Sequence, residues 1–571
     1  MGKPSKNGKQ HLLNVYEALR KQLDCESNSN YSEPIQKTVN YIMGKYPNIE
    51  KVIMKYELPN PDEEPDLKIT MTTGEVIKVN LFSLKSTGKI QPKNPGAKSF
   101  LAKYFRSGHI QDQFNLFLER EYKLFLQSIV AVKEELNEYD SVTILKKKVN
   151  QMYPSFNKEI NPFRTSLLFN LREKLFELLQ QQSVTFAEGL SAGYRDLMLL
   201  DSTNIITRYL DGSAGSIVEE WQPTAQLDEI QIYKKGNDTV GIRMGQSALT
   251  LRLKFESSPE SSLKLATSYD EFPLENKREL VNKKSLTKFQ KLLNHHPETV
   301  IGNDKNAIGK CNEAIIYAAF IENYPQIYQV DSQVYYTMFE TYSPKVKEET
   351  VTYLNDAAQT AVTEIEQYLI KKHGTFEVES IQLVPQSYLK NRLDTADIQL
   401  SVKSNGKTIS EDFSLKAASK RGNWITMKNP GAGTILGPTF FGIGSLTIDT
   451  DRVKKQFEAG TLTHQESISE ISKSLGEQLE QAPQANLKKG LEALLGKAVT
   501  VVTFYSEQSS TYFEHNQIDT QIKISPQTPT PINTFVEWNN GEEYLKLRVK
   551  FSGGQAKGWT SIKLACEYKV E

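Results

Sequence analysis

The sequence lacks the residues that mark several common classes of protein. Its three cysteines, Cys25, Cys311 and Cys566, are too few and too scattered for a disulfide framework or a zinc site, so we expect them to be packing residues. The seven histidines form no metal-binding motif, and no glycine-rich loop has nucleotide-binding spacing. These absences argue against a zinc enzyme, a dinucleotide-dependent enzyme and an ATP-driven motor.

Long apolar runs and an excess of charge of either sign are also missing. No segment reaches the roughly 20 apolar residues of a membrane-spanning helix, and no apolar signal segment is seen. We therefore expect a cytoplasmic protein with no membrane partner. The 69 basic side chains balance the 69 acidic ones, so the whole chain has no net attraction for nucleic acid. Any nucleic-acid surface must come from local clusters of lysine and arginine.

One segment of the chain occurs twice. The stretch from Asp66 to Lys85 returns 331 positions later, from Asp397 to Lys416, and in both the aspartate and the lysine are 19 residues apart (85 − 66 = 19 and 416 − 397 = 19). Each stretch ends in Phe-Ser-Leu-Lys and is followed by the pentapeptide Lys-Asn-Pro-Gly-Ala. The repetition indicates a duplicated unit.

The duplication extends to the end of each half. The sequence Leu-Arg-Leu-Lys-Phe at 251–255 matches Leu-Arg-Val-Lys-Phe at 547–551, and Lys-Leu-Ala follows both. Each half is near the usual size of a domain. We therefore predict a first copy over residues 1–270, a helical linker over 271–304 and a second copy over 305–571, which form a pseudo-dimer within one chain.

Both copies show the same predicted order of elements. Apolar residues at helical spacing predict an opening helix, followed by a second helix (35–43 or 351–370) and an apolar strand (51–56 or 376–384). Alternating strands around a glycine-containing turn then predict an antiparallel hairpin, and a helix such as 114–129 comes next. This order predicts a mixed α/β fold, in which each copy has a mixed sheet flanked by helices and a strand-rich C-terminal extension.

The repeated hairpin carries residues that suit metal-dependent hydrolysis. In each copy a serine and a lysine stand two positions apart on one strand, so their side chains leave the same face. Mg²⁺ prefers oxygen ligands, often one or two carboxylates with waters and substrate phosphate. Asp66 and Asp397 can each supply one carboxylate, and a nearby lysine can orient an attacking water. The candidate catalytic residues are Lys85, Lys416, Ser83 and Ser414.

These features resemble the PD-(D/E)XK superfamily of restriction endonucleases, whose core carries an aspartate at the start of one strand and an acid-X-lysine on the next. Asp66 with Lys85, and Asp397 with Lys416, match the two ends of this motif. In both copies the middle acid of the family is replaced by a serine, which is a poor metal ligand. Some members of the superfamily carry the missing carboxylate on the preceding helix.

The opening helices offer Glu17 and Glu313 at comparable positions. Glu313 shares a helix face with the apolar residues at 316, 317 and 320, so we expect it to point toward the core, where an acid needs a partner or a metal. Glu17 has Lys21 one turn further on, and these two can instead form a surface ion pair. The resemblance implies Mg²⁺ as the cofactor, with Mn²⁺ as a substitute, and the metal ligands Asp66, Glu17, Asp397 and Glu313.

A short basic loop follows the lysine strand in each copy. Backbone amides beside glycine, together with lysine side chains, suit a phosphate. The alternative is a rigid turn that caps the next element. The candidate DNA-binding residues are Lys93, Asn94, Lys428, Asn429, Lys420 and Arg421.

These features and the resemblance predict a sequence-specific double-stranded DNA endonuclease of the type II restriction kind. With one active site in each copy, a monomer would cut both strands without an obligate protein partner. Contacts that choose the sequence are expected in the strand-rich ends, 130–270 and 460–570. Two alternatives stay open: a nuclease-derived DNA-binding or scaffold protein with one or both sites inactive, whose hairpins are inherited scaffold, and an RNase of the same fold.

Overall fold

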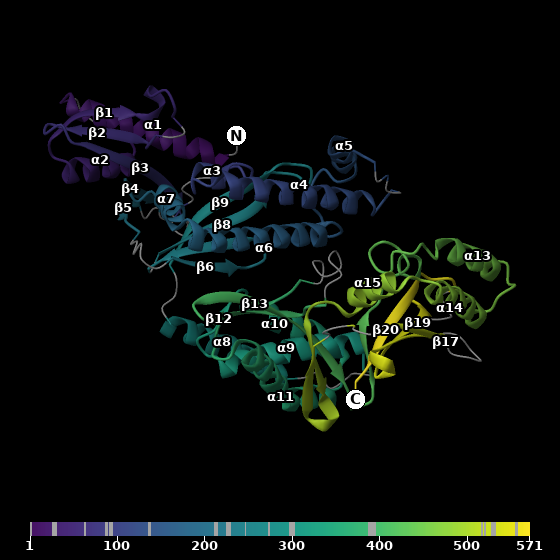
Figure 1. Ribbon diagram of the computed structural model, residues 1–571. Helices are drawn as coiled ribbons and strands as arrows, with labels where there is room; N and C mark the ends of the chain where they lie inside the picture. Colours follow the sequence, from purple (N-terminus) through teal and green to yellow (C-terminus); the bar gives the residue numbers. More distant parts are fainter. Residues whose placement is uncertain are drawn as a thin grey trace. The chain divides into compact units, whose positions relative to one another are not determined.

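The computed structural model contains two compact units, Met1–Leu274 and Glu275–Glu571. Figure 1 labels their helices and strands. The boundary between the units lies close to residue 270, where the sequence predicts the end of the first copy. The residues that the structure describes are 3–25, 31–61, 64–85, 90, 95–134, 137, 139–209, 215–223, 230–245, 247–271, 275–295, 303–385, 395–514, 518, 521–526, 533–553 and 558–570.

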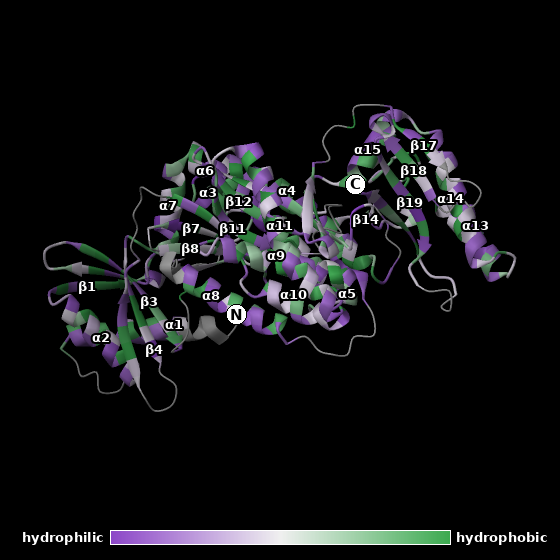
Figure 2. Ribbon diagram, turned by 90° about the horizontal axis from the view of Figure 1, so that it is seen from below, coloured by the Kyte–Doolittle hydropathy of each residue, from purple (hydrophilic) through white to green (hydrophobic). Residues whose placement is uncertain are grey.

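The first unit begins with a five-stranded sheet, in the order β1-β2-β3-β4-β5, that packs against helices α1 and α2. Neighbouring strands are antiparallel except β3 and β4, which are parallel. In α2 the buried residues Ile35, Val39 and Ile42 recur at helical spacing, and Figure 2 shows both hydrophobic and hydrophilic residues along this helix. The elements are α1 (Lys3–Leu23), α2 (Glu33–Lys45), β1 (Ile49–Met54), β2 (Leu67–Met71), β3 (Val76–Lys85), β4 (Thr203–Tyr209) and β5 (Ser216–Trp221).

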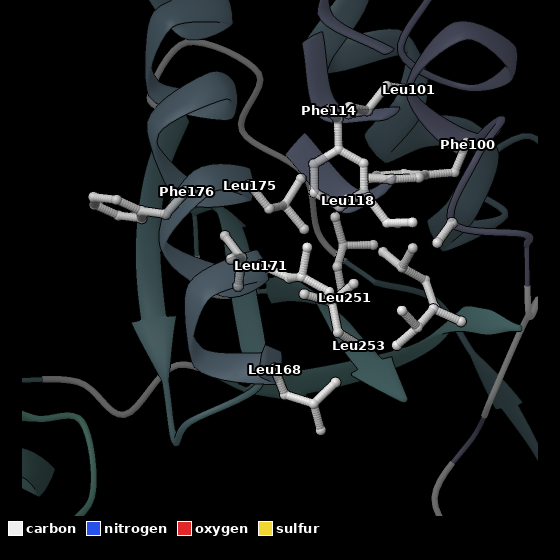
Figure 3. Packing of buried hydrophobic residues seen from close by; sticks show 14 of the residues in the cluster. Phe100, Leu101, Phe114, Leu118, Leu168, Leu171, Leu175, Phe176, Leu251 and Leu253 are labelled. Atoms are coloured by element: carbon white, nitrogen blue, oxygen red, sulfur yellow. The ribbon is translucent and has the colours of Figure 1, made fainter. Parts of the chain in front are cut away.

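The rest of the first unit packs a four-stranded antiparallel sheet, in the order β6-β7-β8-β9, against helices. Figure 3 shows Phe114 of α4 and Leu171 of α6 in one core with Leu251 and Leu253 of β8. The elements are α3 (Phe100–Lys103), α4 (Gly108–Val130), α5 (Val142–Met152), α6 (Asn161–Thr185), α7 (Ala187–Met198), β6 (Ile230–Lys235), β7 (Thr239–Met244), β8 (Ser247–Phe255) and β9 (Leu263–Glu271).

The second unit begins with a six-stranded sheet, in the order β10-β11-β12-β13-β15-β16. Helix α9 is buried along most of its length between α11, α10 and this sheet. The elements are α8 (Glu275–Leu293), α9 (Lys305–Asn323), β10 (Tyr328–Gln329), α10 (Val334–Tyr342), α11 (Glu348–His373), β11 (Glu377–Leu383), β12 (Ile398–Ser404), β13 (Lys407–Ala418), β15 (Val499–Phe504) and β16 (Ser509–Phe513).

A five-stranded antiparallel sheet, in the order β14-β20-β19-β18-β17, completes the second unit. Its apolar face packs against α14 and α15, in a core that also includes Ala418, Val502 and Phe504 of the six-stranded sheet. The elements are β14 (Trp424–Lys428), α13 (Thr447–Glu458), α14 (His464–Glu480), α15 (Gln484–Leu495), β17 (Lys523–Pro526), β18 (Asn533–Trp538), β19 (Glu543–Phe551) and β20 (Ile562–Lys569).

The first sheets of the two units share one strand topology. The neighbours β1-β2-β3-β4-β5 and the neighbours β11-β12-β13-β15-β16 both run antiparallel, antiparallel, parallel and antiparallel. The second unit adds only the short edge strand β10, which pairs with β11 in parallel. The mixed α/β fold class expected from the sequence is confirmed, and a duplicated unit would have this shared topology.

Residues 275–293 of the predicted linker form α8, which packs within the second unit. Phe289 on this helix is 2% exposed and its ring contacts those of Tyr335 and Phe339 on α10. Asn282 donates hydrogen bonds to two backbone carbonyls that follow α9. These contacts hold α8 against α10 and against the segment that follows α9.

Two expectations about composition can be compared with the structure. Cys311 and Cys566 are buried, as packing residues should be, whereas Cys25 is exposed, so that prediction was wrong for Cys25. Among the described residues, none of the helices combines the length and the apolar character needed to cross a bilayer.

Candidate active site

Asp397 lies directly before β12, the first strand of the central hairpin of the second unit. The residue is 5% exposed. Its Oδ2 accepts hydrogen bonds from the backbone N–H of Leu415 (2.8 Å), from Oγ of Ser414 (3.3 Å) and from Nζ of Lys416 (3.5 Å). Three successive residues of β13 therefore hold this carboxylate.

Glu313, on α9, is a second buried carboxylate in this region, with 6% exposure. Lys310, one turn earlier, donates to both of its oxygens at 2.6 and 2.7 Å. The helix packs against β13, and Nδ2 of Asn312 donates to the backbone oxygen of Lys416 at 3.4 Å. This contact places the middle of α9 beside the lysine of the hairpin.

The charges of these residues act on one another. The pKa of Glu313 is raised to about 8, first by burial and then by the negative charge of Asp397, while Lys310 and Lys416 act in the opposite direction. Two buried carboxylates that repel each other are stabilised when a cation binds between them.

This set of donors fits a divalent cation with oxygen ligands. Mg²⁺ is usually held by one or two protein carboxylates, with waters and substrate phosphate in its other positions. Asp397 and Glu313 provide two carboxylates, and Oδ1 of Asn312 is buried without a hydrogen-bond partner among the described residues. In the described part of the chain, no three histidine, cysteine or acidic side chains are grouped as metal ligands. The arrangement therefore suits a cation that shares its ligands with substrate.

Asp66 occupies the corresponding position in the first unit. The backbone N–H of Leu81 donates to Oδ2 of Asp66 at 2.9 Å, as that of Leu415 does to Asp397 at 2.8 Å. The other oxygen of Asp66 forms an ion pair with Lys55 at 2.7 Å. The carboxylate is thus held by the same backbone contact but paired with a different lysine.

Lys55 reaches Asp66 from the end of β1 and not from the hairpin. Its backbone N–H donates to the carbonyl oxygen of Asp66 at 3.1 Å, and in the second unit Val384 makes the same contact to Asp397 at 2.9 Å. A valine therefore stands in the second unit where the first unit has its paired lysine.

The two hairpins differ in length by three residues. One position after each aspartate, Leu67 pairs with Val79 in the first unit, whereas Ile398 pairs with Phe413 in the second. The paired residues are 12 positions apart in the first case and 15 in the second (79 − 67 = 12 and 413 − 398 = 15). The longer paired strands of the second hairpin explain the difference, because seven residues of β12 pair with β13 whereas four residues of β2 pair with β3. The turn acts in the opposite direction, since it has two residues, Asn405 and Gly406, in the second hairpin and five, 71–75, in the first.

This register changes which residue of β3 corresponds to the catalytic candidate of β13. Counted from the paired residues, Phe82 takes the place of Lys416. Lys85 lies three residues further along β3 and is exposed, and it leaves the face opposite to Phe82, as Ser83 does. The predicted correspondence of Ser83 and Lys85 with Ser414 and Lys416 is therefore wrong. Both lysines follow their aspartate by 19 residues, but the hairpin of the first unit is three residues shorter, so Lys85 lies three residues beyond the position that corresponds to Lys416.

The opening helix of the first unit brings a histidine toward Asp66. Glu17 is exposed on α1, and Lys21 lies over the ring of Tyr31 with Nζ 5.4 Å from its centre. His11 is 4% exposed, and burial lowers the pKa of this imidazole to about 4, against the opposing charge of Asp66. Glu17 therefore lies in a different environment from Glu313, because Glu17 is exposed to solvent and Glu313 is buried.

Lys428, a candidate DNA contact, has a structural partner. Its Nζ donates to the backbone oxygen of Ala493, in the last turn of α15, at 2.6 Å. A positive charge at this end of a helix complements the helix dipole. This contact favours the interpretation of the loop as a cap on the next element.

The other candidate DNA contacts are exposed where the structure describes them. Asn429, Lys420 and Arg421 all lie at the surface. The Nε atom of Arg421 is 3.7 Å from a carboxylate oxygen of Glu507. Lys93 and Asn94 lie outside the described residues.

The comparisons with known proteins bear on the whole chain. No protein-family model matches it. It is 41% identical over 573 residues to the type II restriction enzyme BsuRI of Bacillus subtilis, and the match covers 100% of each protein. The chain belongs to this family of type II restriction enzymes. Because the match runs from end to end, it includes both units.

Within this restriction-enzyme chain, sequence reasoning missed three neighbours of the candidate residues. Lys310 precedes Glu313 by three positions, and this helical ion-pair spacing was visible in the sequence. Lys55 and His11 approach Asp66 from separate elements, so only the folded chain reveals them.

Proposed function

We propose that the chain is a sequence-specific endonuclease that hydrolyses double-stranded DNA with a divalent metal ion, acting in the cytoplasm. The catalytic group is Asp397, Glu313 and Lys416. The observation that carries this proposal is geometric, in a member of the type II restriction family: Lys416 contacts the buried carboxylate of Asp397, and the helix that holds the buried carboxylate of Glu313 contacts the backbone of Lys416. Mg²⁺ is the proposed cofactor, and Mn²⁺ should replace it.

Each residue of the group has a role that follows from its position. Asp397 and Glu313 would hold the ion, which when bound supplies positive charge to the phosphate and to a water. In hydrolysis the water oxygen joins phosphorus and one phosphorus–oxygen ester bond breaks, which leaves a phosphate end and a hydroxyl end. Lys416 can orient the water and offset the charge that develops on the phosphate oxygens. Ser414, whose Oγ donates to Asp397, positions that carboxylate.

A plasmid assay tests this function. With Mg²⁺ or Mn²⁺ the protein should cut plasmid DNA into discrete bands, and a chelator should stop the reaction. A smear would indicate a nuclease without sequence preference, and cleavage of RNA alone would favour the RNase alternative. Binding of DNA without any cleavage would favour the nuclease-derived binding protein.

We also propose that the two units are copies of one ancestral nuclease unit. Their first sheets share one strand topology, and each holds its aspartate with a leucine N–H of the next strand. The repeated Pro-Gly loop supports the same proposal. The carbonyl of Pro95 accepts a hydrogen bond from the N–H of Leu265 at 3.0 Å, and that of Pro430 accepts one from Leu564 at 2.9 Å.

DNA phosphates are proposed to contact the second sheet of each unit, on the face turned away from its own helices. In β19 the leucine and valine side chains face the core with α14, so the alternate residues Lys546, Arg548 and Lys550 leave the opposite face. Lys550 lies directly opposite Lys563 of β20. The pKa of Lys550 is lowered by burial and by the nearby positive charges of Arg548 and Lys563, against the charge of Glu567.

The same pair of lysines occurs in the first unit. Lys254 of β8 lies directly opposite Lys264 of β9. Like charges opposite each other destabilise a sheet, and a phosphate between them would remove the repulsion. In the first unit Glu256 forms an ion pair with Lys264, so this pair is partly neutralised. The repetition supports a phosphate site at this place in both units, with the less neutralised site in the second.

Replacing Lys550 or Lys563 with alanine should weaken DNA binding at every sequence and lower the slope of log affinity against log salt by about 1 each. Fluorescence anisotropy of labelled duplexes without divalent ions measures both quantities. Lys473→Ala, on an exposed position of α14, is the matched control and should change neither. An unchanged salt slope in both sheet variants would contradict the phosphate site.

A further inference from the structure

We propose that the first unit cuts no DNA, so that each chain has one hydrolytic centre and a double-strand break needs the second units of two chains. This inference rests on the proposed function, and it changes the number of cutting sites in a chain from the two expected on sequence grounds to one. The evidence is the difference between the two hairpins.

The positions that carry the serine and the lysine in the second unit have structural roles in the first. Phe82, in the place of Lys416, packs against the core formed with α4 and α6. Asn80, in the place of Ser414, donates from Nδ2 to Oδ1 of Asn204 on β4 at 3.0 Å, and both asparagines are buried. At the position of β3 that corresponds to Lys416, the first unit therefore has no positively charged side chain that could contact Asp66.

Lys85 does not fill this gap. It stands at the last position of β3, where it pairs in register with Tyr209 of β4 and is exposed. Alternation along the strand sends its side chain to the face opposite to Phe82. The backbone N–H that holds Asp66 belongs to Leu81, four positions before Lys85, whereas in the second unit the corresponding leucine directly precedes its lysine.

The donors around Asp66 also fit a divalent ion poorly. Lys55 pairs with the carboxylate at 2.7 Å, and the two side chains are 24% and 16% exposed, so the charge of Asp66 is balanced within the protein. The buried neighbour on α1 is the neutral imidazole of His11 and not a second carboxylate. Mg²⁺ prefers carboxylate, carbonyl and water oxygens, and imidazole suits other metals.

One centre per chain has a geometric consequence. The two strands of a duplex run in opposite directions, so a centre that accepts one strand meets the other in the wrong direction. A second chain related to the first by a two-fold axis presents its own centre to the second strand. The first unit would then bind DNA without cutting it, and the opposed lysines Lys254 and Lys264 would contact a phosphate.

A mixing experiment tests this arrangement. Wild-type protein is combined with a tenfold excess of the Asp397→Asn variant and added to a supercoiled plasmid, and early products are separated on a gel. Most pairs of chains that contain any active centre then contain only one. We expect nicked circles to become the main early product, whereas wild-type protein alone at the same total concentration gives linear DNA. Lys416→Ala serves as a second inactive partner if the aspartate variant fails to fold.

If linear DNA were the main early product both of wild-type protein alone and of wild-type protein mixed with the inactive variant, the proposal would be overturned, because one chain would then cut both strands. Lys85→Ala gives an independent result: it should linearise the plasmid at the wild-type rate within about twofold, and an accumulation of nicked circles would show that the first unit cuts. Failure of the wild-type protein to cut at all would instead contradict the proposed function.

Discussion

Replacing Asp397 with asparagine should abolish metal-dependent cleavage, with a loss of at least ~10²–10³-fold in the rate of strand scission. The substitution keeps the shape of the side chain and an oxygen that can accept the N–H of Leu415, but it removes the negative charge that a divalent ion needs. Plasmid cleavage measures the rate, and calorimetric titration with Mn²⁺ measures ion binding. Asp66→Asn is the matched control and should retain cleavage. Equal losses in the two variants would contradict the assignment of the ion to the second unit.

The same titration should depend on pH in the wild-type protein. Because the pKa of Glu313 is raised to about 8, its carboxyl holds a proton at lower pH, and the ion must displace that proton. Ion affinity should therefore rise with pH up to about 8 and level off above it. Proton release at pH 7 appears as a difference between titrations in buffers with different heats of ionisation. Glu313→Gln should remove both the pH dependence and the released proton.

The part of the site that the sequence predicts well is the part encoded locally. Glu313 shares one helix face with apolar residues, and the structure buries it on α9. Asp397, Ser414 and Lys416 lie on one two-strand hairpin whose turn is short, so counting residues along the strands places them together. Local periodicity and a well-defined turn were sufficient in this unit.

The same reasoning failed in the first unit because strand register depends on the turn. The aspartate and the lysine are 19 residues apart in both units. The hairpin of the first unit is three residues shorter, so its lysine lies three residues further along β3 than Lys416 lies along β13. An odd shift in register moves side chains to the other face of a sheet. Lys85 therefore leaves the wrong face, and nothing in the spacing alone could show it.

The neutral net charge also concealed the proposed DNA surface. The lysines at 254 and 264, and those at 550 and 563, are isolated in the sequence, and only strand pairing places them opposite each other. The runs of adjacent basic residues that sequence reasoning selected include Lys420 and Arg421, which lie at the surface. Long-range pairing across strands creates local charge that a count along the chain does not detect.

Replacing Lys416 with alanine should slow strand scission by ~10²-fold or more while ion binding and DNA binding are retained. The contact of Lys416 with Asp397 is the longest of the three at 3.5 Å, so the carboxylate keeps its hydrogen bonds to Leu415 and Ser414 when the lysine is removed. The loss should therefore fall on the chemical step, which single-turnover cleavage with saturating protein measures. Lys85→Ala removes the same group from the other hairpin and should be nearly silent. If the two alanine variants lost equal activity, the three-residue shift between the hairpins would not explain function, and Lys85 would have to act from the face on which β3 places it.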